Sequence, residues 1–396
     1  MKYNFDEIID RSKTNSRKWN PEIYKNTYNG KTDLLPLWVA DMDFKVAPAI
    51  LDSLQAVLAH GILGYTAADE EYFQAIIDWN KNRKNVDLKK EWIIFTNGVV
   101  PALNYMIQTF TEEGDSILIQ TPVYHPFRIS TENNNRKIVT NPLIDTNGYY
   151  TVDFNDFEKK IIDNNVKMFI LCNPHNPVGR VWTKEELEKM GEICLKHNVL
   201  VVSDEIHSDL IFKDSKFTSF LTLKDELKNN CIVCTAPSKT FNLAGLQTSL
   251  ILIADDEIRE KFDKYYNSIG GDRLETPSTF GIEAIKAGYM HSAEWLDELI
   301  DYLDENRKFI EEYIKENMPG VKYLKPEGTY LAWIDFRNVL KDGETLEEIF
   351  EDKAKVAIDY GNWFGEEGAG YVRLNFACPK SIVKEALDRV KNVIFK

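Results

Sequence analysis

The sequence predicts an α/β protein, with a large domain whose mostly parallel sheet is flanked by helices, and a smaller α+β domain. Three observations predict this fold class. From residue 92 to residue 235, short apolar runs of strand length alternate with longer segments of helical periodicity, which is typical of parallel sheets. Beyond residue 288 this alternation gives way to a long charged helix and separate strands. The chain of 396 residues is long enough for about two domains.

The composition is that of an ordinary globular protein, because 43% of the residues are hydrophobic and 28% are charged, which argues against disorder. No apolar run approaches the roughly 18 residues of a membrane-spanning helix, so we expect no membrane partner. The first residues lack the apolar core of a signal peptide, and we expect a cytoplasmic location. A net charge of −15 with scattered lysines and arginines argues against a nucleic-acid partner.

Residues 1–45 are predicted to form an N-terminal arm that joins the small domain, with 38–40 as its apolar segment. An amphipathic helix is expected over 47–59, broken at His60-Gly61, and a second helix over 70–81.

The large domain is expected to span residues 46–287. Its predicted strands are short and apolar: 92–96, 116–120, 167–172, 200–203 and 231–235. A helix is predicted over 99–110, and the capping box that begins at Thr183 starts another that ends near Lys196.

The small domain is expected to span residues 288–396. Helical periodicity covers 293–317 and 381–393, and strand-like runs cover 330–336 and 373–376.

Five cysteines in a chain without an export signal make a disulfide framework improbable. Cys231 and Cys234 have C-x-x-C spacing, but they are three apart on a predicted strand and so face opposite sides of the sheet. We interpret both as core residues rather than as a redox pair or metal ligands.

Three polar residues follow the ends of predicted strands: Asn176, Asp204 and Lys239. Open α/β sheets bind ligands beyond the carboxyl ends of their strands, so the sequence predicts one site that contains all three. Lys239 lies in a turn of small residues that is poor in helix and strand formers, and burial there would favour its neutral, nucleophilic amine. A surface lysine in a loop is the alternative.

Two further features fit such a site. The helix predicted from Val99 begins directly after Asn97-Gly98, and its free amides and dipole favour an anion. Tyr124 follows the strand at 116–120, where its ring could stack on a flat ligand, although a core tyrosine is equally consistent with the pattern.

The segment from Ser238 to Gln247, SKTFNLAGLQ, resembles the cofactor-lysine segment of fold type I pyridoxal-phosphate (PLP) enzymes, the class I/II aminotransferase superfamily. Within it the chain is similar to the cystathionine β-lyase, or cysteine C–S lyase, branch. The likeness extends over nearly the whole chain, because PLWVADMDF at 36–44, GYT at 64–66 and RLNFACP at 373–379 follow in the family's order.

The resemblance implies a cofactor, pyridoxal 5′-phosphate, and a role for each site residue. Lys239 would hold the cofactor as a Schiff base and later act as the catalytic base. Asp204 would pair with the ring nitrogen, Tyr124 would stack on the ring, and Asn176 and His207 would contact the ring oxygen. His207 stands where many aminotransferases have a tyrosine, which weakens its assignment.

Other roles concern the phosphate and the substrate. The amides of Val99 and Val100 and the hydroxyl of Ser238 would bind the phosphate, and the resemblance implies that Tyr65 of a second subunit reaches it in a homodimer. Arg373, with Asn176, would bind the carboxylate of an amino-acid substrate. Typical aminotransferases have an arginine eight residues after the lysine, but this chain has Gln247, which fits the lyase branch better.

The function implied is α,β-elimination on cystathionine or related cysteine S-conjugates, giving a thiol, pyruvate and ammonia. A PLP-dependent aminotransferase is the main alternative. A metal-dependent hydrolase using Asp204, Glu205 and His207 would need a further ligand cluster, and the sequence has six scattered histidines and no metal motif. A binding or regulatory protein without turnover is disfavoured by intact Lys239 and Arg373.

Overall fold

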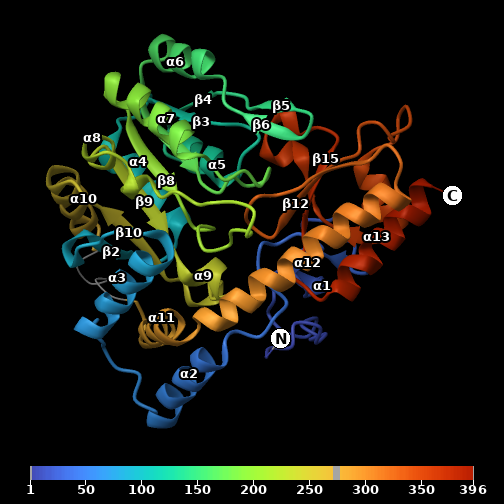
Figure 1. Ribbon diagram of the computed structural model, residues 1–396, viewed down its shortest axis with the longest axis horizontal. Coiled ribbons are helices and arrows are strands. Elements are labelled where there is room, and N and C mark those ends of the chain that lie inside the picture. The colour runs from blue at the N-terminus through green and yellow to red at the C-terminus, as the bar shows by residue number, and fades with distance from the viewer. Residues whose placement is uncertain (1, 271–276, 396) are drawn as a thin grey trace.

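The computed structural model describes residues 2–270 and 277–395. Two sheets organise the described chain, and they lie side by side in Figure 1 with the larger one on the left. The larger sheet has seven strands in the order β2-β10-β9-β8-β7-β3-β4. Their bounds are β2 (Ile93–Thr96), β3 (Ser116–Ile119), β4 (Lys137–Thr140), β7 (Val166–Cys172), β8 (Leu200–Asp204), β9 (Cys231–Thr235) and β10 (Ser249–Ile253).

The sheet is mostly parallel, as predicted, because β9, β8, β7, β3 and β4 pair in parallel. Only β10 is antiparallel to its neighbours within the sheet, β9 and β2. Strand β10 was not among the predicted strands. Four apolar residues follow Ser249 in it, and a run this short cannot be told from a buried helical segment by periodicity.

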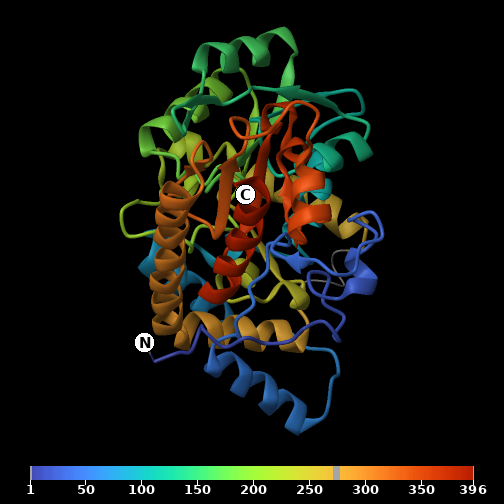
Figure 2. The ribbon, with the colours of Figure 1, turned by 90° about the vertical axis from the view of Figure 1, so that its right-hand side faces the viewer.

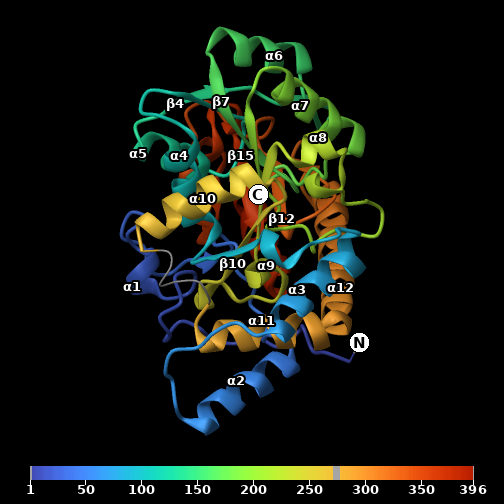
Figure 3. The same cartoon turned by 90° about the vertical axis from the view of Figure 1, so that its left-hand side faces the viewer.

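Helices cover both faces of this sheet and separate its core into two parts. On one face, α4 (Val99–Phe110), α5 (Pro126–Asn133) and α10 (Asp256–Ser268) pack on alternate strand residues such as Val202. The opposite face of the sheet, which includes Val201, packs on a second group of helices: α3 (Glu70–Lys84), α6 (Phe154–Asp163), α7 (Lys184–Lys196) and α11 (Thr279–His291). Figure 3 shows α4 and α10 on the near side of the sheet.

The alternation of faces confirms the interpretation of the two cysteines on β9. Cys231 packs in the core on one face and Cys234 in the core on the other, and both are fully buried free thiols. The predicted helix 99–110 and strand 231–235 have the expected bounds. The Thr183 capping box is also confirmed, since its side chain and that of Glu186 make reciprocal bonds to the backbone.

The smaller sheet is antiparallel, with strand order β11-β12-β15-β14. Its strands are β11 (Lys322–Leu324), β12 (Leu331–Asp335), β14 (Asp359–Tyr360) and β15 (Tyr371–Asn375). The long helix α12 (Ala293–Asn317), predicted with the same bounds, runs beside α13 (Lys380–Ile394) in Figures 1 and 2. The expected domain boundaries at residues 45 and 287 stay a prediction.

The N-terminal region packs against the C-terminal part of the chain, where the Asn375 amide of β15 donates to the Leu37 carbonyl at 2.9 Å. Strand β1 (Leu35–Pro36) pairs in parallel with β13 (Val356–Ala357), a contact across more than three hundred residues. Helix α2 (Pro48–His60) ends at Gly61, whose φ of 78° is the left-handed conformation that glycine adopts without strain. The helix projects from the bottom of the molecule in Figures 1 to 3.

The remaining elements are short: α1 (Pro21–Tyr24), β5 (Ile144–Thr146), β6 (Tyr149–Thr151), α8 (Asp225–Lys228) and α9 (Pro237–Thr240). The expectation that Lys239 lies outside regular structure is wrong, because α9 forms one helical turn with Pro237 at its start. Within residues 2–270 and 277–395, no helix has the length and apolar character needed to cross a membrane. The expected cytoplasmic location stays a prediction.

Candidate active site

A cavity of about 210 Å³ lies beyond the carboxyl ends of the central strands. Eight of the ten residues proposed from the sequence line it: Val99, Val100, Tyr124, Asn176, Asp204, His207, Ser238 and Lys239. They come from segments far apart in the chain, because the parallel strands β7, β8 and β9 all end at this edge. The cavity is therefore where the sheet topology predicts a ligand site.

The Lys239 amine lies in the cavity wall and has a carbonyl rather than a carboxylate as its hydrogen-bond partner. Its Nζ donates to the Ala40 carbonyl at 2.5 Å, and the Tyr330 hydroxyl donates to the same oxygen at 2.9 Å. Burial lowers the pKa of Lys239 to about 8, opposed by the charges of Asp41 and Asp204 and assisted by Arg373. The amine therefore loses its proton more readily than an ordinary lysine.

Asp204 is the last residue of strand β8, and it lines the cavity. Burial raises its pKa to about 7, although the Ile206 amide donates to it at 3.1 Å and Lys239 lowers the pKa by its charge. A buried carboxylate without a cationic partner in contact is costly to ionise. The site would therefore stabilise a protonated ring nitrogen placed beside this group.

His207 and Asn176 are two further polar side chains of the cavity. Burial lowers the pKa of His207 well below its ordinary value, so the ring is neutral, and its Nδ1 has no partner among the described residues. Asn176 accepts a hydrogen bond at its Oδ1 from Arg373 at 3.0 Å, which leaves its amino group for a ligand. The ring of Tyr124 is packed edge-on to Phe127, and the Tyr124 amide donates to the Asn176 carbonyl.

The N-terminus of α4 opens into the same cavity. Its N-cap is Gly98, which provides no side chain to cap the first amides, and its φ of 145° favours glycine. The amides of Val99 and Val100 are thus available to an anion, and the Ser238 hydroxyl lines the same cavity.

Arg373 reaches the site from the smaller sheet, where its hydrogen bonds go to oxygens and its guanidinium lies over the Phe364 ring. Its Nη2 pairs with the carboxylate of Asp359 on the adjacent strand and donates to the Trp38 carbonyl at 3.0 Å. Burial raises the pKa of Asp359 to about 6, and the Arg373 charge opposes this effect. Among the residues that the structure describes, Nε of Arg373 is buried without a hydrogen-bond partner, so this donor is free for a ligand.

Tyr65 does not line this cavity. Its side chain is fully exposed in the connection between α2 and α3, and it lines a neighbouring hollow of about 460 Å³. Asn97 and Gln247 line both spaces, so the hollow adjoins the anion end of the cavity. Within one chain, Tyr65 is not assembled with the other proposed site residues.

Three contacts of the site were missed by the sequence analysis. They are the Ala40 carbonyl on Lys239, the Tyr330 hydroxyl on that carbonyl, and the Asp359 carboxylate on Arg373. A carbonyl oxygen carries no signal in a sequence. Asp359 had a weak signal, because it is a single acid inside the apolar run 356–360, and a buried acid usually has a partner.

The residues proposed for a metal site do not converge. Glu205 follows Asp204 directly, and its carboxylate accepts bonds from the Ser219 hydroxyl at 2.7 Å and the Phe220 amide at 2.8 Å, outside the cavity. Among the residues that the structure describes, no group of three or more histidine, cysteine or acidic side chains could hold a metal ion.

Comparison with known proteins gives consistent matches along the whole chain. The sequence pattern of the family described as Aminotransferase class I and II matches residues 32–390. Cystathionine beta-lyase PatB from Bacillus subtilis (strain 168) is 44% identical over 98% of this chain and 99% of its own length. The crystal structure of cystalysin from Treponema denticola, which contains a pyridoxal 5′-phosphate cofactor, is 40% identical with a TM-score of 0.94, covering 99% of each chain. The PLP-bound C-S lyase from Staphylococcus hominis is 32% identical with a TM-score of 0.92, covering 100% of this chain and 98% of its own.

Proposed function

The chain belongs to the aminotransferase class I and II family, and from this premise we propose that it is a PLP-dependent carbon–sulfur lyase. It performs α,β-elimination on cystathionine or related cysteine S-conjugates and releases a thiol, pyruvate and ammonia. One observation carries the proposal. The Lys239 amine, the Asp204 carboxylate and the amides of α4 line one cavity, in a chain that aligns end to end with named C–S lyases.

The groups of the cavity fit the proposed cofactor. The pyridine nitrogen of the cofactor needs a carboxylate, and its ring oxygen needs polar contacts. Its aldehyde needs an amine, and its phosphate needs amide donors. Asp204 supplies the carboxylate, and Lys239 supplies an amine whose pKa is lowered to about 8. The unpartnered Nδ1 of His207 and the free amino group of Asn176 suit the ring oxygen. Tyr124 supplies an aromatic face for the ring.

The phosphate is assigned to the amides of Val99 and Val100 and the Ser238 hydroxyl, because that end of the cavity has donors and the positive pole of a helix. Gln247, in the wall beside them, is neutral. The phosphate charge is therefore left to amides, hydroxyls and the dipole rather than to an arginine at this position.

When bound, pyridoxal phosphate supplies an electron sink for the negative charge that develops on the substrate's Cα. Arg373 orients the substrate by donating to its carboxylate, together with the Asn176 amide. The Lys239 amine then removes the proton from Cα, a role suited to a buried lysine that loses its own proton easily. The Cα–H and Cβ–S bonds break, sulfur leaves as a thiolate, and water converts the remaining three-carbon fragment to pyruvate and ammonia.

The homodimer is part of the proposal, with Tyr65 donating to the phosphate of the partner's site. Support comes from the surface around it, because Leu58, Ile62, Leu63 and Tyr65 are all strongly exposed along one stretch of chain. A run of large apolar side chains in water favours burial against another protein surface. A second copy of this chain is the occupant that would also give Tyr65 a partner.

A product assay tests the function. Purified protein loaded with cofactor should convert cystathionine to pyruvate, ammonia and homocysteine without any 2-oxo acid. Alanine, which has no leaving group on Cβ, is the matched control and should give no pyruvate under these conditions. If turnover instead requires a 2-oxo acid and leaves the carbon–sulfur bond intact, the protein is an aminotransferase.

A further inference from the structure

The segment 38–44 lies between the two cations of the candidate site and contacts both. Arg373 donates to the carbonyl of Trp38 at 3.0 Å. Lys239 donates to the carbonyl of Ala40, two residues after Trp38, at 2.5 Å. We call residues 38–44 the linking segment. Any shift of its backbone would change the surroundings of the catalytic amine and of the substrate-binding guanidinium together.

Two asparagines, each two or three residues after one of the cations in the sequence, hold the linking segment in place. Asn375 Nδ2 donates to the carbonyls of Val39 and Asp41, each at 2.6 Å. Asn242, three residues after Lys239, accepts from the Met42 amide and donates to the Met42 carbonyl, both at 3.0 Å.

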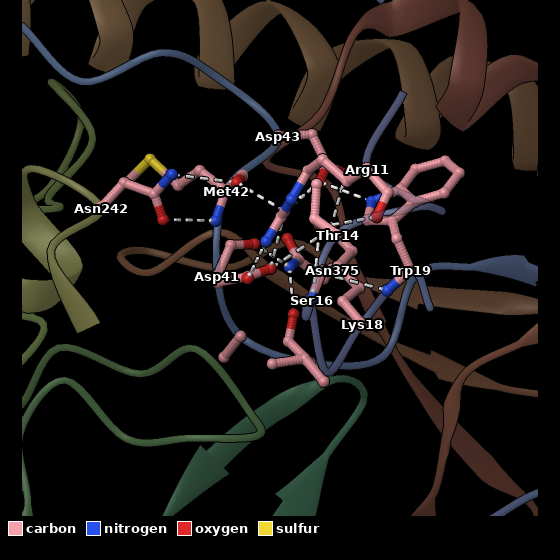
Figure 4. Close-up of polar contacts among 12 residues, drawn as sticks. Arg11, Thr14, Ser16, Lys18, Trp19, Asp41, Met42, Asp43, Asn242 and Asn375 are labelled. Carbon is pink, nitrogen blue, oxygen red and sulfur yellow. Dashed lines mark hydrogen bonds and ion pairs between the residues drawn. The ribbon is translucent and has the colours of Figure 1, made fainter. Parts of the chain in front are cut away.

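On its other side the segment is held by charges from the N-terminal arm. Arg11 donates to Asp41 Oδ2 and to Asp43 Oδ1, each at 2.6 Å, and Lys18, fully buried, donates to Asp43 Oδ2 at 2.7 Å. Trp19 Nε1 adds a bond to Asp43 Oδ1 at 2.7 Å. Figure 4 shows Asn242 approaching from one side and Arg11, Lys18 and Trp19 from the other.

This arrangement balances charge close to the catalytic amine. Two carboxylates, Asp41 and Asp43, face two cations, Arg11 and Lys18, so the cluster is neutral as a whole. Asp41 directly follows Ala40, whose carbonyl accepts from Lys239, and its charge favours the protonated amine. Arg11 is bound to that same carboxylate and offsets its charge.

We propose that Arg11 and Asp41 are positioning residues of the lyase, which hold the Ala40 carbonyl against the Lys239 amine and set the balance of charge that the amine experiences. The inference rests on the proposed function, since it gives Lys239 its role as base. Neither residue touches the substrate in this proposal, and both act through the linking segment.

Other charged and titratable groups face the amine as well. Asp204 from β8 favours its protonated form, and Arg373 from β15 disfavours it. The neutral His207 ring lines the same cavity, and the Tyr330 hydroxyl shares the Ala40 carbonyl. All four stay unchanged when Arg11 or Asp41 is replaced, so each replacement alters one charge only.

The test measures the protonation of Lys239 without cofactor or substrate. Cofactor-free protein is acetylated over a series of pH values, and mass spectrometry follows the peptide that contains Lys239. The midpoint in wild-type protein is expected near 8. Arg11→Met leaves an uncompensated carboxylate and should raise the midpoint by about one pH unit, whereas Asp41→Asn should lower it by about one pH unit. The double variant should return close to the wild-type value.

Opposite shifts separate this proposal from a purely structural role. A loosened arm would move both midpoints in the same direction, or neither, while lowering the unfolding temperature, and that result would overturn the proposal. Glu7→Gln, which breaks the exposed arm pair with Lys45, is the matched control and should leave the midpoint unchanged. Because labelling needs no turnover, the outcome does not depend on whether the chain cleaves cystathionine.

Discussion

The two cations of the candidate site have differently built surroundings. Arg373, in the smaller sheet, pairs with the Asp359 carboxylate and donates to two further oxygens. Lys239, at the edge of the larger sheet, has a carbonyl as its hydrogen-bond partner, and burial lowers its pKa to about 8. The proposed roles need an arginine that stays charged to bind a carboxylate and a lysine that can lose its proton to act as a base. The structure fits both, because a carboxylate contacts the arginine alone.

Replacing Lys239 should produce the largest effect. Lys239→Ala removes the proposed base and the covalent attachment of the cofactor, so the rate of pyruvate release should fall by at least about 10³-fold. Borohydride reduction of the loaded wild-type protein should fix the cofactor on the peptide that contains Lys239. Lys89→Ala, at an exposed position, serves as the control. An adduct on a different lysine would refute the whole assignment.

Replacing Arg373 should affect substrate binding more than cofactor binding. Arg373→Met removes the charged donor proposed for the substrate carboxylate and should lower kcat/KM by about 10²–10³-fold, mainly through KM. Arg373→Lys keeps the charge without the fork geometry and should recover part of the loss. The visible absorbance of the bound cofactor should be retained in both variants. An unchanged KM would contradict the assigned role.

Replacing the two buried carboxylates, Asp204 and Asp359, should change the free energy of unfolding by different amounts. The folded-state pKa of Asp204 is raised to about 7, so its ionisation costs stability that grows as the pH rises from about 4 to 7. Cofactor-free Asp204→Asn should therefore be more stable than wild type at pH 8, by about 2–4 kcal/mol, and the gap should narrow at pH 5. Urea denaturation followed by tryptophan fluorescence measures both values.

Asp359→Asn is the matched comparison, because the Arg373 charge opposes the effect of burial there and the pKa of Asp359 is raised less, to about 6. This variant should therefore stabilise the cofactor-free protein less than Asp204→Asn does at pH 8. If it stabilises the protein as much or more, the distinction between a paired and an unpaired carboxylate is wrong.

The smallest effect is expected at Tyr65, which within one chain lies outside the cavity and contacts neither Arg373 nor Lys239 in the described structure. Tyr65→Phe should weaken cofactor retention by about 1–2 kcal/mol, the scale of one hydrogen bond to a charged group. Equilibrium dialysis of the cofactor measures the loss, and Tyr149→Phe, a partly exposed tyrosine elsewhere, is the control. In mixtures of Tyr65→Phe and Lys239→Ala chains, hybrid dimers would contain one site without either change. A fully active monomer would disprove the shared site.

Much of the fold could be predicted because its signals are local. The helix 99–110, the strand 231–235 and the helix 293–317 follow from periodicity, apolar runs and helix-terminating residues within each segment. Asn176, Asp204 and Lys239 meet in one cavity because parallel strands end at a common edge. That rule needs only the alternation of strands and helices, which the sequence contains.

The sequence by itself therefore determined the fold class, the edge of the sheet where the cavity lies and three of the side chains that line it, Asn176, Asp204 and Lys239. Only the tertiary structure decided which groups contact the charged side chains of Lys239 and Arg373. Lys239 and Ala40 are separated by 199 residues, and Arg373 and Trp38 by 335, so their contacts depend on how independently formed elements pack. No local pattern encodes that packing, yet it determines which cation is compensated and which is left ready to lose its proton.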